Sequence, residues 1–101
     1  MTYVTTKAEY DAAVATGRVL VDFWATWCGP CMMMGDRIEK ELVPTAPDVK
    51  VVKVNVDEAH EPAVQFGIDS IPAFLLFEDG KVTKKTVGAM PLEALAQRLG
   101  L

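Results

Sequence analysis

The sequence has little of what a disulfide framework, a metal site or a membrane segment requires. Its 101 residues include two cysteines and a single histidine, His60. No apolar run approaches the ~20 residues that a membrane helix needs. Acidic residues outnumber basic ones by 14 to 10, which leaves a net charge of −4, whereas a nucleic-acid-binding surface is basic. We therefore expect no membrane span and no nucleic-acid partner.

The remaining composition is that of one globular domain. Half of the residues are hydrophobic and 24% are charged, a balance typical of chains that fold around a core. Because domains commonly contain ~100–150 residues, we expect a single domain over residues 1–101. The segment Met1–Lys7 contains no apolar stretch of the kind found in secretory signals, so we expect a cytoplasmic protein.

Hydrophobic periodicity predicts an α/β fold. Thr6 and Glu9 form the pattern of a capping box at the start of a first helix, and Asp79–Gly80 is typical of a two-residue hairpin turn. The predicted strands are 3–5, 19–24, 49–56, 73–77 and 82–87. The predicted helices are 6–16, 28–43, a short one over 61–67 and a last one that begins at Pro91. The order βαβαβαββα implies a central mixed β-sheet flanked by helices on both faces.

The two cysteines, Cys28 and Cys31, are separated by two residues. A disulfide across so short a loop contributes little stability, and the cytosol keeps thiols reduced. A zinc site needs four ligands, so a site on this pair would need His60 with a carboxylate, or a second chain. An iron–sulfur cluster would likewise need thiols from a partner. The pair therefore favours redox chemistry over metal binding.

The position of the pair explains how it could react. It lies between a predicted buried strand and a predicted helix, whose N-terminal amides and dipole stabilise a thiolate. We expect Cys28 to be exposed at this helix end and to attack disulfides. Cys31, one turn further and on the core face, would be shielded and would resolve the product. Gly29 keeps the approach to sulfur open, and Pro30 suits a first helical turn.

The segment Val21–Cys31, with the sequence VDFWATWCGPC, resembles the active-site signature of the thioredoxin family. Further matches follow in the same order at Lys53–Asp57, Phe66–Ile68, Ser70–Pro72, Asp79–Lys81 and Val87–Ala89. The similarity therefore covers nearly the whole chain. It implies the thioredoxin fold and a thiol–disulfide oxidoreductase that reduces protein disulfides through a mixed-disulfide intermediate.

The resemblance also implies roles for single residues. Cys28 matches the nucleophile and Cys31 the resolving cysteine, and Pro72 matches a proline whose preceding peptide bond is cis. Asp22 matches a buried acid that relays a proton to or from Cys31, and Lys53 the lysine beside it. An acid within an apolar strand should have a raised pKa, although Asp22 could instead be a structural partner of Lys53. The docking surface would comprise Trp27, Gly29, Pro30, Ile71, Gly88 and Ala89.

The partners follow from the resemblance as well. It implies a flavin-dependent thioredoxin reductase that regenerates the dithiol with NADPH, and disulfide-containing target proteins. We expect a monomer that binds no cofactor itself. Two other classes stay open: a binding module that uses the fold without the chemistry, and a metal carrier. The carrier would use the cysteines with Met32–Met34, because thiolate and thioether are soft Cu(I) ligands.

Several positions depart from the family pattern. Met32 stands where a basic residue is common, Gly35–Asp36 where a kinking proline is usual, and Ala73 where threonine is usual, while Asp69 adds an acid near the site. A cation beside a thiolate lowers its pKa, and Met32 provides none. We therefore expect a higher Cys28 pKa, and a more reducing protein, than in relatives with a basic residue there.

Overall fold

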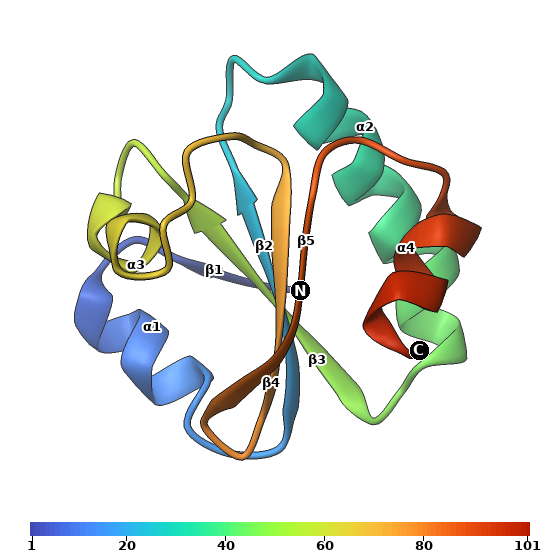
Figure 1. Ribbon diagram of the computed structural model, residues 1–101, viewed down its shortest axis with the longest axis horizontal. Helices are drawn as coiled ribbons and strands as arrows, with labels where there is room; N and C mark the ends of the chain where they lie inside the picture. Colours follow the sequence, from blue (N-terminus) through green and yellow to red (C-terminus); the bar gives the residue numbers. More distant parts are fainter.

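Five strands form one mixed sheet in the order β1-β3-β2-β4-β5. In the computed structural model, which describes residues 1–101, the strands are β1 (Thr2–Val4), β2 (Arg18–Trp24), β3 (Val49–Asn55), β4 (Ala73–Glu78) and β5 (Lys81–Val87). β3 runs parallel to β1 and β2, whereas β4 is antiparallel to β2 and β5. β2 is therefore central, and the edges are the short β1 and the largely exposed β5 (Figure 1).

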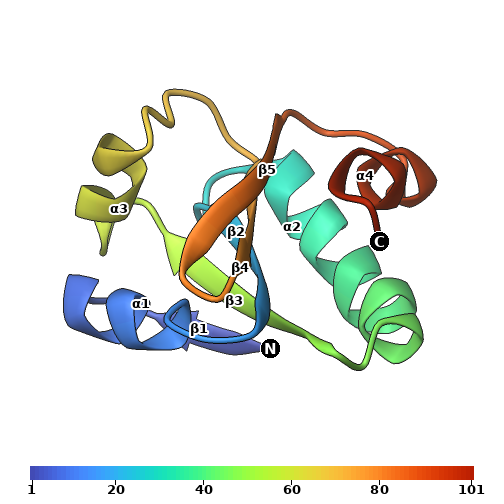
Figure 2. The same ribbon diagram turned by 60° about the horizontal axis from the view of Figure 1, so that its bottom comes forward.

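The helices cover both faces of this sheet. They are α1 (Lys7–Ala13), α2 (Gly29–Arg37), α3 (His60–Gln65) and α4 (Leu92–Leu99). α1 and α3 lie on one face, and α2 and α4 lie on the other (Figures 1 and 2). The predicted architecture and element order are thus confirmed. None of the helices has the length and apolar character needed to cross a membrane.

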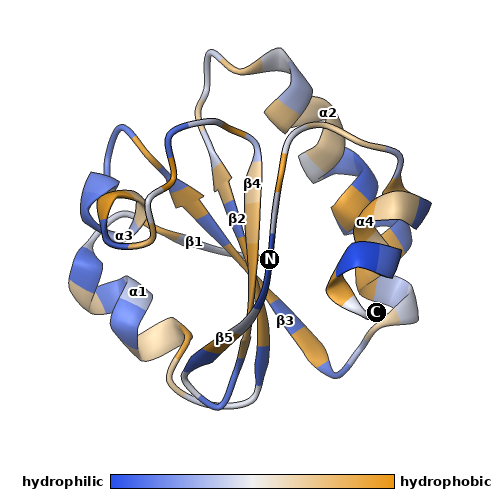
Figure 3. Cartoon of the chain, in the orientation of Figure 1, coloured by the Kyte–Doolittle hydropathy of each residue, from blue (hydrophilic) through white to orange (hydrophobic).

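Each face of the sheet has its own hydrophobic core. Side chains alternate along β2, so Val21 and Phe23 pack on the side of α1 and α3, while Leu20 packs with Met34 of α2. Because both faces are covered, apolar residues dominate the central strands, most completely in β4, where only the last residue is polar (Figure 3). By the same alternation, Asp22 lies on the side of α2.

The helix ends differ from the prediction. α1 ends at Ala13, three residues before the predicted end. The helix predicted over 28–43 changes its hydrogen bonding, because α2 continues as a π-helical turn (Ile38–Leu42) and a 3₁₀ turn (Val43–Thr45). Pro44 has no N–H, so a regular α-helix cannot pass through it. The hairpin turn between β4 and β5 is as predicted, with positive φ at both of its residues.

Candidate active site

The two cysteines form a disulfide at the N-terminus of α2. Cys28 is the N-cap residue and Cys31 lies in the first turn, with their Cα atoms 5.2 Å apart. The backbone N–H of Cys31 donates a hydrogen bond to Cys28 Sγ at 3.3 Å. Pro30 occupies a first-turn position, where its missing N–H leaves no helical bond unmade. The helix thus directs a donor at the sulfur on which it would stabilise a thiolate.

The expectation that Cys28 is exposed is wrong for this disulfide form. Cys28 is 6% exposed and Cys31 is fully buried. The bond to Cys31 holds Cys28 against Ala25, and Trp24 and Ile71 pack around the pair. Cys28 nevertheless remains the more accessible of the two sulfur-bearing residues.

Two loops meet beside the disulfide. The Ile71–Pro72 peptide bond is cis, and Ile71 packs against the cysteine cluster. The N–H of Gly88 donates to the carbonyl oxygen of Pro72 at 2.8 Å, which joins the segment after β5 to the start of β4. Gly88 has a φ of +105°, a conformation that residues with a Cβ rarely adopt. The backbone of Ile71 makes no hydrogen bond within the chain and remains free to pair with an extended peptide.

A buried ion pair lies on the α2 side of the sheet. Asp22 and Lys53 are paired residues of β2 and β3, 1% and 4% exposed, with Lys53 Nζ 3.2 Å from Asp22 Oδ2. No hydroxyl, amide or backbone N–H donates a hydrogen bond to either carboxylate oxygen, so the Lys53 ammonium is their only polar partner. Burial raises the pKa of Asp22 to about 6, although the Lys53 charge lowers it in part. The pair can therefore hold or release a proton near neutral pH.

The sheet register places this pair beneath α2. Leu20, two residues before Asp22 and on the same face, packs with Met34. Cys31 precedes Met34 by about one helical turn and lies on the buried side of the same helix. The arrangement combines a helix-capped disulfide, a cis-proline loop and a buried acid.

The comparisons with known proteins agree with this geometry. The family model described as Thioredoxin matches residues 1–100. The chain belongs to the thioredoxin family. It is 44% identical over 99 residues to the thioredoxin of Alicyclobacillus acidocaldarius, covering 97% of this chain and 94% of the relative. It is 41% identical over 92 residues to the thioredoxin of Bacillus subtilis, covering 91% and 88%.

Solved structures of thioredoxins have the same fold as this chain. A thioredoxin structure from Plasmodium falciparum superimposes with a TM-score of 0.88 at 35% identity, covering 96% of this chain and 94% of that one. The mitochondrial thioredoxin 3 of Saccharomyces cerevisiae, in its oxidised form, gives a TM-score of 0.87 at 34% identity, covering 100% and 95%. With its Cys-x-x-Cys disulfide, this thioredoxin-family protein is a thiol–disulfide oxidoreductase.

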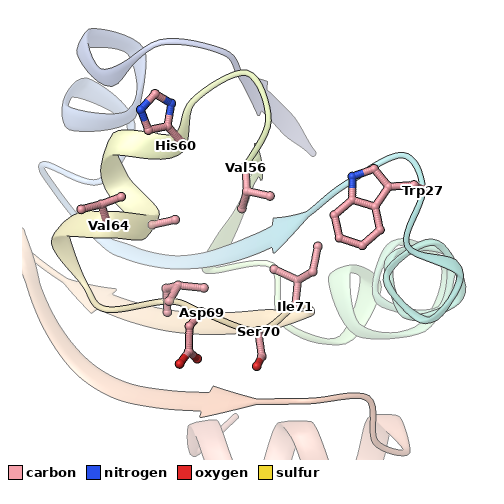
Figure 4. Close-up of a pocket in the computed structure, with 9 residues that line it drawn as sticks. Trp27, Val56, His60, Val64, Asp69, Ser70 and Ile71 are labelled. Carbon is pink, nitrogen blue, oxygen red and sulfur yellow. The ribbon is translucent and has the colours of Figure 1, made fainter.

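An apolar groove extends from the thioredoxin-family motif toward α3. Trp27 is 68% exposed, and its Nε1 donates to Asp57 Oδ2 at 2.8 Å. The groove has a volume of about 270 Å³ and lies between Trp27, α3 and the loop before the cis proline; Figure 4 shows it. Its lining residues are Trp27, Val56, His60, Ala63, Val64, Ile68, Asp69, Ser70 and Ile71.

Of the nine residues that line the groove, the sequence placed only Trp27 and Ile71 in the site. The residues that it did not place there include His60, which was considered only as a zinc ligand, Asp69, which was noted only as a nearby acid, and Val64. In the structure all three line the groove beside Trp27, and Val64 is 72% exposed. An exposed valine on a short helix is a weak signal, because the approach of α3 to Trp27 depends on tertiary packing.

A second cavity lies on the opposite side of the motif. It has a volume of about 370 Å³ and combines Pro30, Ala89 and Met90 with Met33 and Met34 of α2. Met32 instead lines a different cavity, with Lys53. The three consecutive methionines therefore do not converge on the cysteines. The structure contains no cluster of three or more His, Cys, Asp or Glu side chains that could hold a metal ion.

Proposed function

We propose that this protein reduces disulfides in target proteins and is returned to its dithiol form by a thioredoxin reductase. The observation that carries the proposal is the disulfide itself. It lies at the start of α2, with the Cys31 N–H donating to Cys28 Sγ. A surface with free backbone groups at Ile71 adjoins it.

The reaction begins with the reduced dithiol. The Cys28 thiolate attacks one sulfur of a target disulfide, forms the Cys28–target mixed disulfide and releases the first target thiolate. Cys31 then loses its proton and attacks Cys28 Sγ. The Cys28–Cys31 disulfide forms, the mixed disulfide breaks, and the second target thiolate leaves. Two electrons pass from the dithiol to the target.

Asp22 takes the proton that Cys31 releases. Its pKa of about 6 leaves the carboxylate ionised at neutral pH but able to hold a proton, as an effective general base requires. Lys53, 3.2 Å away, favours the ionised form before the transfer. The buried position of the pair under α2 supports this role over a purely structural one.

The target docks on the surface around the disulfide. An extended segment of the target pairs with the free backbone of Ile71, a form of strand addition, and Pro72 holds the loop in position. The bond between Gly88 and Pro72 supports a single surface on which both loops act together. Its residues are Trp27, Gly29, Pro30, Ile71, Gly88 and Ala89.

The remaining parts of the proposal concern the cell. The reductase is a flavoprotein that draws electrons from NADPH, so NADPH supports the activity without binding this chain. Residues 1–101 act as one domain and a monomer, in the cytoplasm, in electron transport and redox homeostasis. The family membership and the uncharged docking surface support partners that are disulfide-containing proteins.

Reduction of insulin tests the proposal. Insulin precipitates when its interchain disulfides are reduced. The protein is assayed once with a dithiol as electron source and once with NADPH and a bacterial thioredoxin reductase. We expect precipitation in both assays and none above background with Cys28→Ser. Dithiol-driven activity without reductase-driven activity would refute the recycling partner. Failure of both assays, in a folded protein, would refute disulfide reduction.

A further inference from the structure

Gly35 stands in a place where a helix ordinarily avoids glycine. It lies inside α2 and is buried. It is not among the glycines with positive φ, so its backbone conformation is open to any residue. Glycine is the poorest helix former after proline. The reason for a glycine must therefore lie in the space beside it.

That space is filled by the Lys53 ammonium. A Cβ placed on Gly35 would lie 2.6 Å from Lys53 Nζ, which is closer than two such atoms can approach. The same Nζ lies 3.2 Å from Asp22 Oδ2 and 4.9 Å from the centre of the Trp24 ring. The ammonium is thus enclosed by a carboxylate, an indole face and the bare backbone of α2. Gly35 follows Cys31 by four residues, about one helical turn.

We propose that Gly35 is a positioning residue: because it has no side chain, the Lys53 ammonium can approach the Asp22 carboxylate beneath α2 and keep it ionised for the proton of Cys31. This inference rests on the proposed role of Asp22 as proton acceptor. Any side chain at position 35 would displace the flexible end of Lys53, and the carboxylate would lose part of the field that favours its charge.

The other charged groups near this pair are less well placed. Asp36 and Glu39, from α2 and the π-helical turn, line the cavity beside Lys53, together with Tyr3 from β1. Asp36 is exposed and pairs with Lys40 at 3.1 Å, so solvent screens its charge. From β4, the residue opposite Asp22 is the apolar Phe74. The Lys53 ammonium is therefore the charged group that most affects the ionisation of the Asp22 carboxyl.

The test is a carboxyl NMR titration of Asp22 in the oxidised protein, whose cysteines do not titrate. The variants are Gly35→Ala, Lys53→Met and the two combined, with Met33→Ala as a control on the exposed side of the same helix. If the ammonium moves from 3.2 Å to ~5 Å at an effective dielectric constant of ~20, the Asp22 pKa rises by roughly 1.4 units. We expect this rise in Gly35→Ala, none in Met33→Ala, and no further rise when Gly35→Ala is added to Lys53→Met.

Two results would overturn the inference. One is an unchanged Asp22 titration in Gly35→Ala, and the other is an equal rise in the Lys53→Met background, which would show that Lys53 is not involved. A measurement on the unsubstituted protein does not depend on any variant. This measurement is the nuclear Overhauser contact between the Gly35 α-protons and the Lys53 ε-methylene. We expect to observe it, and its absence would contradict the position of the Lys53 side chain against Gly35.

The outcomes for Gly35 and for the proposed proton transfer are separable. If Gly35→Ala shifts the Asp22 titration but the pH profile of insulin reduction does not move, the proton-transfer role is wrong and the positioning by Gly35 stands. If Asp22→Asn slows insulin reduction while Gly35→Ala leaves the Asp22 titration unchanged, the proton-transfer role of Asp22 stands and the positioning role of Gly35 is wrong.

Discussion

Replacing Asp22 with asparagine should make the protein more stable at neutral pH and hardly change it in acid. The substitution keeps the size of the side chain and removes a charge that is 1% exposed and whose only polar partner is the Lys53 ammonium. The raised pKa of Asp22 means that burial costs the carboxylate more than the Lys53 charge returns, so removing the charge is stabilising. The size of the gain follows from the displaced pKa of the carboxyl.

The pKa of Asp22 is raised from 3.8 to about 6, with burial as the main cause and Lys53 opposing it. The native state therefore binds more protons than the unfolded state between these values, so stability falls as pH rises through this window. Above pH ~7 the ionised carboxyl costs the native state about 3 kcal/mol, and at pH ~4 well under 1 kcal/mol. The pKa of about 6 already includes the attraction of Lys53, so this pH-dependent difference is the gain expected on removing the charge.

Urea denaturation of the oxidised wild type and Asp22→Asn, from about pH 4 to pH 8, measures this difference. We expect the variant to unfold at higher urea at pH ~8, by up to roughly 1–3 M if m lies in the usual range, and the two curves to converge at pH ~4. A gain that is the same at both ends of the range would refute the raised pKa. A loss of stability at pH ~8 would show that the pair with Lys53 stabilises the fold.

Two further substitutions test other parts of the account. Met32→Lys places a cation in the first turn of α2, so we expect a lower Cys28 thiolate pKa and a more oxidising potential; thiolate absorbance and equilibration with glutathione measure these, and no shift would show that position 32 does not influence the site. Tyr10→Phe removes a buried hydroxyl that has no hydrogen-bond partner and leaves the ring against Phe77. It should stabilise the protein by about 1 kcal/mol in urea denaturation, and destabilisation would show that the hydroxyl makes a favourable contact.

The sequence predicted the parts of the fold that depend on local pattern. The continuous apolar run of β2 indicated a strand buried on both faces, and Thr6 marked the start of α1, where its side chain accepts from the Glu9 N–H at 3.1 Å. Such patterns depend only on a single strand or helix and on whether its faces are buried. The motif around Cys28 was equally readable, because its position between strand and helix sets its chemistry.

The features that the sequence did not predict arise from contacts between distant segments. The burial of Cys28 depends on the loop of Ile71, which packs over the cysteine pair. The groove beside Trp27 depends on how α3 packs, and so the part of Val64 was missed. Gly35 was noted only as a departure from the family pattern, because its contact with Lys53 requires the helix and β3 to be placed together.

Trapping of mixed disulfides tests the central claim most directly, namely that Cys28 attacks and Cys31 resolves. Reduced Cys31→Ser and Cys28→Ser proteins are incubated with a disulfide-containing protein such as insulin, quenched with acid and separated without reductant. The account predicts a covalent complex with Cys31→Ser that a dithiol releases, and none with Cys28→Ser, whose remaining cysteine is fully buried. Equal trapping by both variants, or trapping by Cys28→Ser alone, would contradict it.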